Sequence, residues 1–438
     1  MQIAEIIVLR DNEKITSYSH ILRTLLNQVF SLSRVGTYIL VIPYLTLPKC
    51  FHNTRIGCFS LSLKYQTGWC KMDLKKNIKK LYLILLFPAG ILLSYLSTLF
   101  PEIVEKFYSS GIYKFIVAPI NLISGFLPFS LGEFLLVGFI VLIITQLIRL
   151  IINLFKTPAK LKKLLLGSLI NIIVFISVMY FSFVVLWGLN YQRLPFSQIA
   201  ALDVQKASVE DLAAVCNNLV IQANELRKYV REDENGVMIL SAGKQDALKR
   251  AHKGYESAAK IYPEFEGFYS RPKGVVLSEV MSYLGIEGIY SPFTGEANVN
   301  ASITDAPFPF TACHEMAHQR GFAREDEANY IAYIACKFHP DKDFQYSGML
   351  YALIYASNAL YQNAPDKYSQ IRANYSEGIS RDLNAINQYW KKYETPVEEF
   401  SSSINNTYLK ANRQEDGIKS YGRMVDLLIA EYKKPTNQ

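Results

Sequence analysis

The sequence predicts a mainly α-helical protein, with three N-terminal transmembrane helices followed by a mostly helical α+β domain. Half of the 438 residues are hydrophobic, and most of them lie in the first 190 positions. Three runs in that part are long and apolar enough to cross a bilayer, which takes about 20 residues each. After Asn190 the chain is polar, with apolar residues at helical spacing. The length itself favours more than one domain.

Three segments are expected to span the membrane, and a fourth apolar segment is not. The expected spans are 81–100, 131–152 and 164–189. The segment 115–129 is interrupted by Pro119, Gly125 and Pro128. We therefore expect it to be interfacial or re-entrant. The membrane domain is predicted to cover residues 72–189, and the second domain residues 190–438.

The orientation of the spans follows from the positions of lysine and arginine, which are enriched in cytoplasmic loops. Four lysines precede the first span, and five basic residues lie at the end of the second span or between it and the third: Lys75, Lys76, Lys79, Lys80, Arg149, Lys156, Lys160, Lys162 and Lys163. The loop between the first and second spans carries only Lys106 and Lys114, offset by Glu102 and Glu105. We therefore expect the domain after Gly188 to be extracytoplasmic.

Residues 1–71 form a doubtful leader. Their apolar run, 35–48, is short for a span and is interrupted by Pro43. Met72 is followed at once by a basic stretch and the first span. We expect Met72 to be the true start, and the alternative is a fourth span near 35–55.

The second domain is expected to be built mostly from helices. Helices are predicted at 208–230, 242–262, 343–362, 366–391 and 418–433. Ser208, with an acidic residue three positions on, forms a capping box for the first of them. The stretch 274–303 is rich in Val, Ile, Tyr and Gly, and we expect short strands with turns there.

The motif HEMAH, residues 314–318, predicts a metal centre. Two histidines four residues apart lie on one face of a helix and can share one ion. Zn²⁺ suits a mixed set of nitrogen and oxygen ligands. Glu315 is rotated about 100° from His314. It can therefore stand beside the metal and act as the catalytic base.

The third ligand is expected from a second helix. Gly321 is a helix stop, and EDEAN, residues 325–329, starts the next helix. Glu325 and Asn329 share a face of that helix. Glu325 is the expected ligand, with Glu327 as the alternative, and Asn329 is expected to hold a ligand histidine in orientation.

HExxH followed by Glu-x-x-Ala-Asn resembles the gluzincin group of zinc metallopeptidases, which are zincins. The resemblance implies a zincin-like α+β domain, with His314, His318 and Glu325 as zinc ligands and Glu315 as catalytic residue. The motif, taken together with 288–300, 408–428 and the three spans, resembles an uncharacterised bacterial membrane-protein family described as zinc metallopeptidases without a demonstrated activity. That resemblance implies that the protein is located in the bacterial inner (plasma) membrane. Only six residues separate His318 from Glu325, which is shorter than gluzincins usually have.

Other residues have more open assignments. Tyr290, Tyr408 and Arg423 are candidates for stabilising an oxyanion, and the sequence does not choose among them. Residues 296–303 can be an edge strand that holds a peptide or an ordinary core strand. Cys313 and Cys336, which flank the motif, are expected to be small buried residues.

The expected function is that of a membrane-anchored zinc metallopeptidase. It would hydrolyse peptide bonds by Glu315-assisted attack of zinc-bound water. Its partners would be the lipid bilayer and a peptide or protein substrate near the outer membrane face. The alternative is a non-catalytic, zinc-containing receptor or regulator. The net charge of +8 does not indicate nucleic-acid binding, because the lysines lie beside apolar runs rather than among stacking aromatics.

Overall fold

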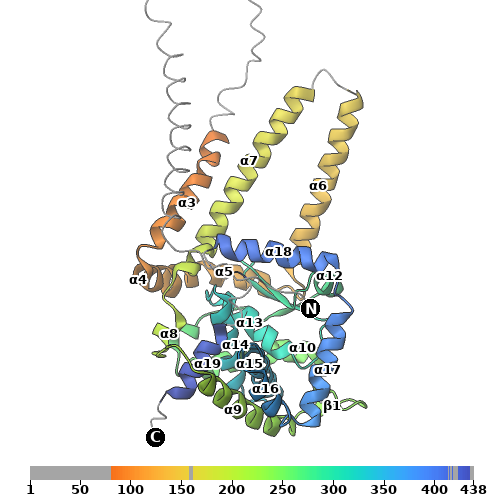
Figure 1. The fold of residues 1–438 in the computed structure, drawn as a ribbon. Coiled ribbons are helices and arrows are strands. Elements are labelled where there is room, and N and C mark those ends of the chain that lie inside the picture. Colours follow the sequence, from red (N-terminus) through yellow and green to blue (C-terminus); the bar gives the residue numbers. More distant parts are fainter. Residues whose placement is uncertain (1–79, 157–160, 413, 415–416, 418–422, 435–438) are drawn as a thin grey trace, which may run out of the picture. The chain divides into compact units, whose positions relative to one another are not determined.

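The computed structural model describes residues 80–156, 161–412, 414, 417 and 423–434, which are mainly helical (Figure 1). The predictions made for residues 1–71, including a start at Met72, lie outside these residues.

Three helices among the described residues are long and apolar enough to cross a membrane, as predicted. They cover Lys80–Ser97, which includes α3 (Leu86–Ser97), then α6 (Leu131–Lys156) and the Leu164–Leu186 part of α7 (Leu161–Leu186). The third ends three residues earlier than expected. Trp187 has left the helical conformation, and a 3-10 turn, Gly188–Gln192, follows. Most apolar side chains of these helices are exposed, which is consistent with contact with lipid.

The segment between the first two of these helices has one buried and one exposed face. It consists of α4 (Pro101–Ile103), a π-helical stretch η2 (Val104–Ile112) and α5 (Tyr113–Gly125). Asn121 of α5 is buried, and its side-chain oxygen accepts hydrogen bonds from Ser270 and Gln319. The opposite face exposes Phe115 and Ile123. The interfacial or re-entrant position of 115–129 stays a prediction.

The helices after Asn190 follow the predicted order, with differences at the breaks. They are α8 (Phe196–Ile199), α9 (Val209–Arg227), α10 (Gly243–Arg250), α11 (His252–Ala258), η5 (Pro263–Phe265), α12 (Ser278–Tyr283), α13 (Phe308–Gln319), α14 (Glu325–Lys337), α15 (Lys342–Asn363), α16 (Pro365–Arg372), α17 (Glu377–Lys391), α18 (Pro396–Ala411) and α19 (Met424–Lys433). Ser208 and Asp211 form the predicted capping box of α9.

Two expected single helices are each divided. The helix predicted at 242–262 is α10 and α11, and the one predicted at 366–391 is α16 and α17. The second break occurs because the Ser376 side chain accepts a hydrogen bond from the Ile379 backbone N–H and starts a new helix. Helix α18 was not predicted, nor was α12 within the stretch expected to form strands.

A three-stranded sheet lies in the expected region 274–303. Its order is β3 (Lys273–Val275), β5 (Glu296–Asn300), β4 (Gly288–Ser291), and β5 is parallel to β3 and antiparallel to β4. β5 is therefore the central strand, and all its residues are buried. Of the two interpretations of 296–303, the core strand is correct, and the two edge strands are β3 and β4. A separate pair, β1 (Arg231–Glu232) and β2 (Met238–Ile239), forms a hairpin.

Helix α13 is buried on all sides, and this places the HEMAH motif at the centre of the domain (Figure 1). It packs against α14, α15 and the sheet. Cys313 and Cys336, on α13 and α14, are buried free thiols, as expected.

Candidate metal centre

A tight turn brings the two metal-binding helices together. Gly321 has a φ of +80°. The Gly321 N–H donates to His318 O and the Phe322 N–H to Ala317 O, the pair of bonds that ends many helices at a glycine. The predicted helix stop is confirmed. The turn reverses the chain so that α14 begins beside the face of α13 that carries the histidines.

Three ligand atoms converge at this point. His314 Nε2 and His318 Nε2 are 3.1 Å apart. Glu325 Oε2 lies 3.2 Å from the first and 3.4 Å from the second. Zinc holds nitrogen and oxygen ligands at about 2.0–2.1 Å, so two ligands at a tetrahedral angle are about 3.3 Å apart. The three separations match this value, and the group can hold one divalent cation.

The charge of Glu325 makes this point favourable for a cation. Burial lowers the pKa of His318, but the neighbouring Glu325 carboxylate outweighs burial and raises that pKa to about 9. Burial raises the pKa of Glu325 itself, while His318 and hydrogen bonds from both histidines bring it well below its ordinary value. Both shifts favour a negative carboxylate facing positive charge.

The rings are held with Nε2 toward this point. His318 Nδ1 lies 2.7 Å from the carbonyl oxygen of Phe322, which can only accept a hydrogen bond. Nδ1 therefore carries the proton, and in the neutral ring the lone pair of Nε2 is free to bind a cation. The Asn329 side chain interacts with the His314 side chain and with Tyr355. Asn329 therefore lies beside a ligand histidine, and its role in orienting that ring stays a prediction.

Glu315 is buried beside the three ligands. Its side chain is 3% exposed, and burial raises its pKa to about 8. The charge of His318 lowers the pKa of Glu315, and the charge of Glu325 raises it. β4 passes so close that a Cβ atom added to Gly288 would lie 2.5 Å from Glu315 Oε1. Only glycine leaves room for the carboxylate at this position.

The alternative ligand, Glu327, points away from the histidines. Its Oε1 accepts hydrogen bonds from the Phe196 backbone N–H at 2.9 Å and from Arg324 Nη1 at 2.7 Å. Of the other histidines, His252 is exposed near Glu256, and His339 is buried against the Arg250 carbonyl. Neither belongs to the cluster.

The three oxyanion candidates lie in different places. The Tyr408 hydroxyl accepts a hydrogen bond from Tyr191 at 3.2 Å. Burial raises the Tyr408 pKa to about 12, with a contribution from the charge of Glu325. Tyr290 is buried, and its hydroxyl lies 3.1 Å from that of Tyr113. Arg423 forms an ion pair with Asp326.

Sequence reasoning missed two neighbours of the motif. The Trp187 ring packs edge-on against His318 with ring centres 5.9 Å apart, and its Nε1 donates to His318 O. Glu287 accepts hydrogen bonds from Tyr351 and Thr311. Its charge contributes to the raised pKa of Glu315. Trp187 directly follows the third apolar helix, where an aromatic residue is common for other reasons. No spacing in the sequence links it to the motif.

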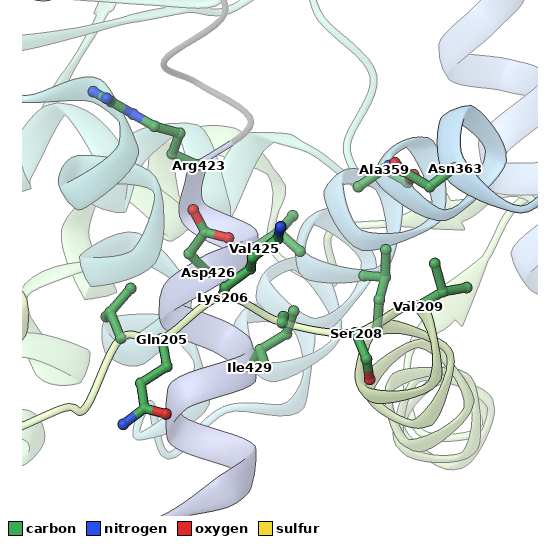
Figure 2. A pocket seen from close by; sticks show the side chains of 13 residues that line it. Gln205, Lys206, Ser208, Val209, Ala359, Asn363, Arg423, Val425, Asp426 and Ile429 are labelled. Atoms are coloured by element: carbon green, nitrogen blue, oxygen red, sulfur yellow. The ribbon is translucent and has the colours of Figure 1, made fainter.

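A cavity of about 550 Å³ lies elsewhere (Figure 2). It is lined by residues before and at the start of α9 together with parts of α15 and α19, including Lys206, Arg423 and Asp426. None of the predicted metal ligands lines it.

Residues 108–429 match the model of a family described as a protein of unknown function (DUF3810). The comparisons found no significant match among curated proteins or solved structures.

Proposed function

We propose that this chain, which belongs to the DUF3810 family of proteins of unknown function, is a membrane-anchored zinc metallopeptidase. The observation that carries the proposal is the convergence of His314, His318 and Glu325, whose ligand atoms are 3.1–3.4 Å apart. The buried carboxylate of Glu315 lies next to them, on the helix that carries the two histidines. A structural zinc site is normally closed by four protein ligands, whereas a catalytic site has three and one open position.

Each residue then has a separate task. His314, His318 and Glu325 would hold zinc, which when bound acts as a Lewis acid and lowers the pKa of water. Glu315 would take the proton of the attacking water and pass it to the leaving amine. Its buried position, which raises the pKa to about 8, suits a group that both accepts and donates a proton near neutral pH.

Tyr408 is the best-supported partner for the developing negative charge on the substrate oxygen. Because its oxygen accepts the hydrogen bond from Tyr191, its own proton remains available for donation. A high pKa keeps that proton in place at neutral pH. The positions of the lysines and arginines favour an extracytoplasmic site, and the resemblance described above implies the bacterial inner membrane.

The first test is the metal content of the full chain purified in detergent. We expect about one zinc per wild-type chain, lost in His318→Ala and in Glu325→Ala. Glu327→Ala is the matched control, since it removes a carboxylate two residues away that faces Arg324. A wild-type chain without zinc, or equal loss in the control, would contradict the proposal.

The second test is cleavage of a proteome-derived peptide library, read by mass spectrometry. We expect wild-type protein to produce cleavage sites that are absent with Glu315→Gln, while both proteins hold zinc. If the two proteins bind zinc and neither cleaves peptides, the metal serves a receptor or regulator instead.

A further inference from the structure

Helix α18 carries an exposed apolar stripe. Val397 is 53% exposed, Phe400 68% and Ile404 55%, at the 3,4 spacing that places them on one helical face. Tyr408 continues the stripe at 38%, whereas Leu409 is fully buried on the opposite side. Aqueous surfaces rarely carry a row of large apolar side chains without a binding partner.

The two ends of α18 are attached near the apolar helices. At its C-terminal end, Tyr408 packs edge-on against Phe183 of α7, with ring centres 6.3 Å apart. At its N-terminal end, Glu398 lies against Gly285, just after α12, where a Cβ would be 3.0 Å from the Glu398 Cγ. Figure 1 shows α18 lying across the ends of α6 and α7.

The start of α12 is in turn attached to α6. The Glu133 carboxylate accepts hydrogen bonds from the backbone N–H of Val276 and of Leu277, at 3.0 and 2.7 Å. Glu133 lies in the first turn of α6. Val276 and Leu277 are themselves 73% and 45% exposed. The apolar surface of α18 therefore continues, through α12, to the point where α6 begins.

We propose that α18 is an interfacial helix, whose stripe of Val397, Phe400 and Ile404 lies in the leaflet that contains the start of α6 and the end of α7. Continuity with both apolar helices favours lipid over a protein partner. The exposed side chains beside the stripe are polar, namely Glu399, Ser403 and Lys410, which is the division expected of a helix lying flat in the headgroup region. The inference does not depend on the metal or on hydrolysis.

One consequence concerns the metal centre. Trp187 at the end of α7 touches His318, and Tyr408 of α18 packs against Phe183 of the same helix α7. The proposal therefore places the metal centre close to the bilayer surface, although the motif is distant from the spans in sequence.

The test uses an environment-sensitive fluorophore on single cysteines of the full chain in phosphatidylcholine nanodiscs. Cys50, Cys58 and Cys70 are replaced by serine, and the buried cysteines are retained. The probe is placed by Ile404→Cys, and the matched control is Ser403→Cys, an exposed neighbour on the polar edge. A second pair is Phe400→Cys and Glu399→Cys.

We expect lipids with a shallow nitroxide to quench the probe at 404 at least threefold more than the probe at 403, and aqueous iodide to show the reverse order. Equal quenching at the two positions would overturn the proposal. Protection of position 404 from both quenchers would also overturn it, because the stripe would then be covered by protein, such as a second copy of the chain.

Discussion

At the scale of single residues, the position of Glu315 depends on the absence of a Cβ atom at Gly288. Gly288 belongs to β4, and a Cβ there would lie 2.5–2.8 Å from the oxygen, Cγ and Cδ of Glu315. Such separations are well below van der Waals contact. The strand and the helix can approach this closely only with glycine at position 288.

Gly288→Ala is expected to displace Glu315 and leave the metal ligands in place. A displacement of about 1 Å in a catalytic group costs about 100-fold in rate, so kcat for peptide cleavage should fall by about that factor. Zinc content should be unchanged. Gly274→Ala in β3, where the nearest atom would be 3.4 Å away, is the control. Loss of zinc in Gly288→Ala would show a wider disturbance.

The two tyrosines among the oxyanion candidates, Tyr408 and Tyr290, differ in what their hydroxyls can do. Tyr408→Phe should lower kcat about 100-fold, as removal of one oxyanion donor does, while zinc remains bound. Tyr290→Phe should change kcat little, because that hydroxyl is paired with Tyr113. Steady-state kinetics of the two variants distinguish the roles. Equal effects would mean that the Tyr408 proton is not used.

At the scale of elements, α14 is held between two helices at glycine contacts. A Cβ at Gly254 of α11 would overlap the carbonyl oxygen of Ala335 in α14 and lie 2.9 Å from its carbon. On the other side, a Cβ at Gly348 of α15 would overlap the Cys336 side chain. These approaches set the depth at which α14 lies, and therefore where Glu325 meets the histidines of α13.

Gly254→Ala should destabilise the protein by about 1–3 kcal/mol, the cost of adding a methyl group to a filled contact. The midpoint of thermal unfolding in detergent is the measurement. Gly167→Ala in α7 is a control, since a Cβ there would meet nothing within 4 Å. An unchanged midpoint for Gly254→Ala would mean that the two helices separate without cost.

At the scale of the whole described chain, a buried ion pair joins the sheet to the apolar helices. Lys273 Nζ lies 2.6 Å from Glu296 Oε1 and also donates a hydrogen bond to the carbonyl oxygen of Ser124, near the end of α5. The Glu296 carboxylate accepts hydrogen bonds from the backbone N–H of Leu131 and of Gly132, the first residues of α6. The strand that packs on α13 is therefore attached directly to a membrane-spanning candidate.

Lys273→Met should destabilise the full chain by about 3–5 kcal/mol, because it leaves the Glu296 charge buried without its partner. Lys228→Met is the matched control. Its pair with Glu225 is exposed to solvent, so this substitution should change the stability little. Denaturant unfolding of both variants in detergent provides the comparison, and equal effects would contradict a structural role for the buried pair.

The ligands and helices were largely predictable from local spacing. A spacing of four positions places His314 and His318 on one helical face, and Gly321 ends that helix because a left-handed φ suits glycine. Long apolar runs predict spans, because a bilayer demands about 20 apolar residues. The breaks within predicted helices, and helix α18, were less visible, since short amphipathic segments carry little periodic signal.

The sequence by itself determined the candidate ligands, the three apolar helices and the mainly helical class, because each depends on residues close together in the chain. Tertiary structure alone decided that the alternative ligand Glu327 faces Arg324 instead of the histidines, that β5 is the central strand, and that Trp187 touches His318. Those outcomes depend on how helices and strands distant in sequence pack, and packing is decided by the shapes of side chains in three dimensions.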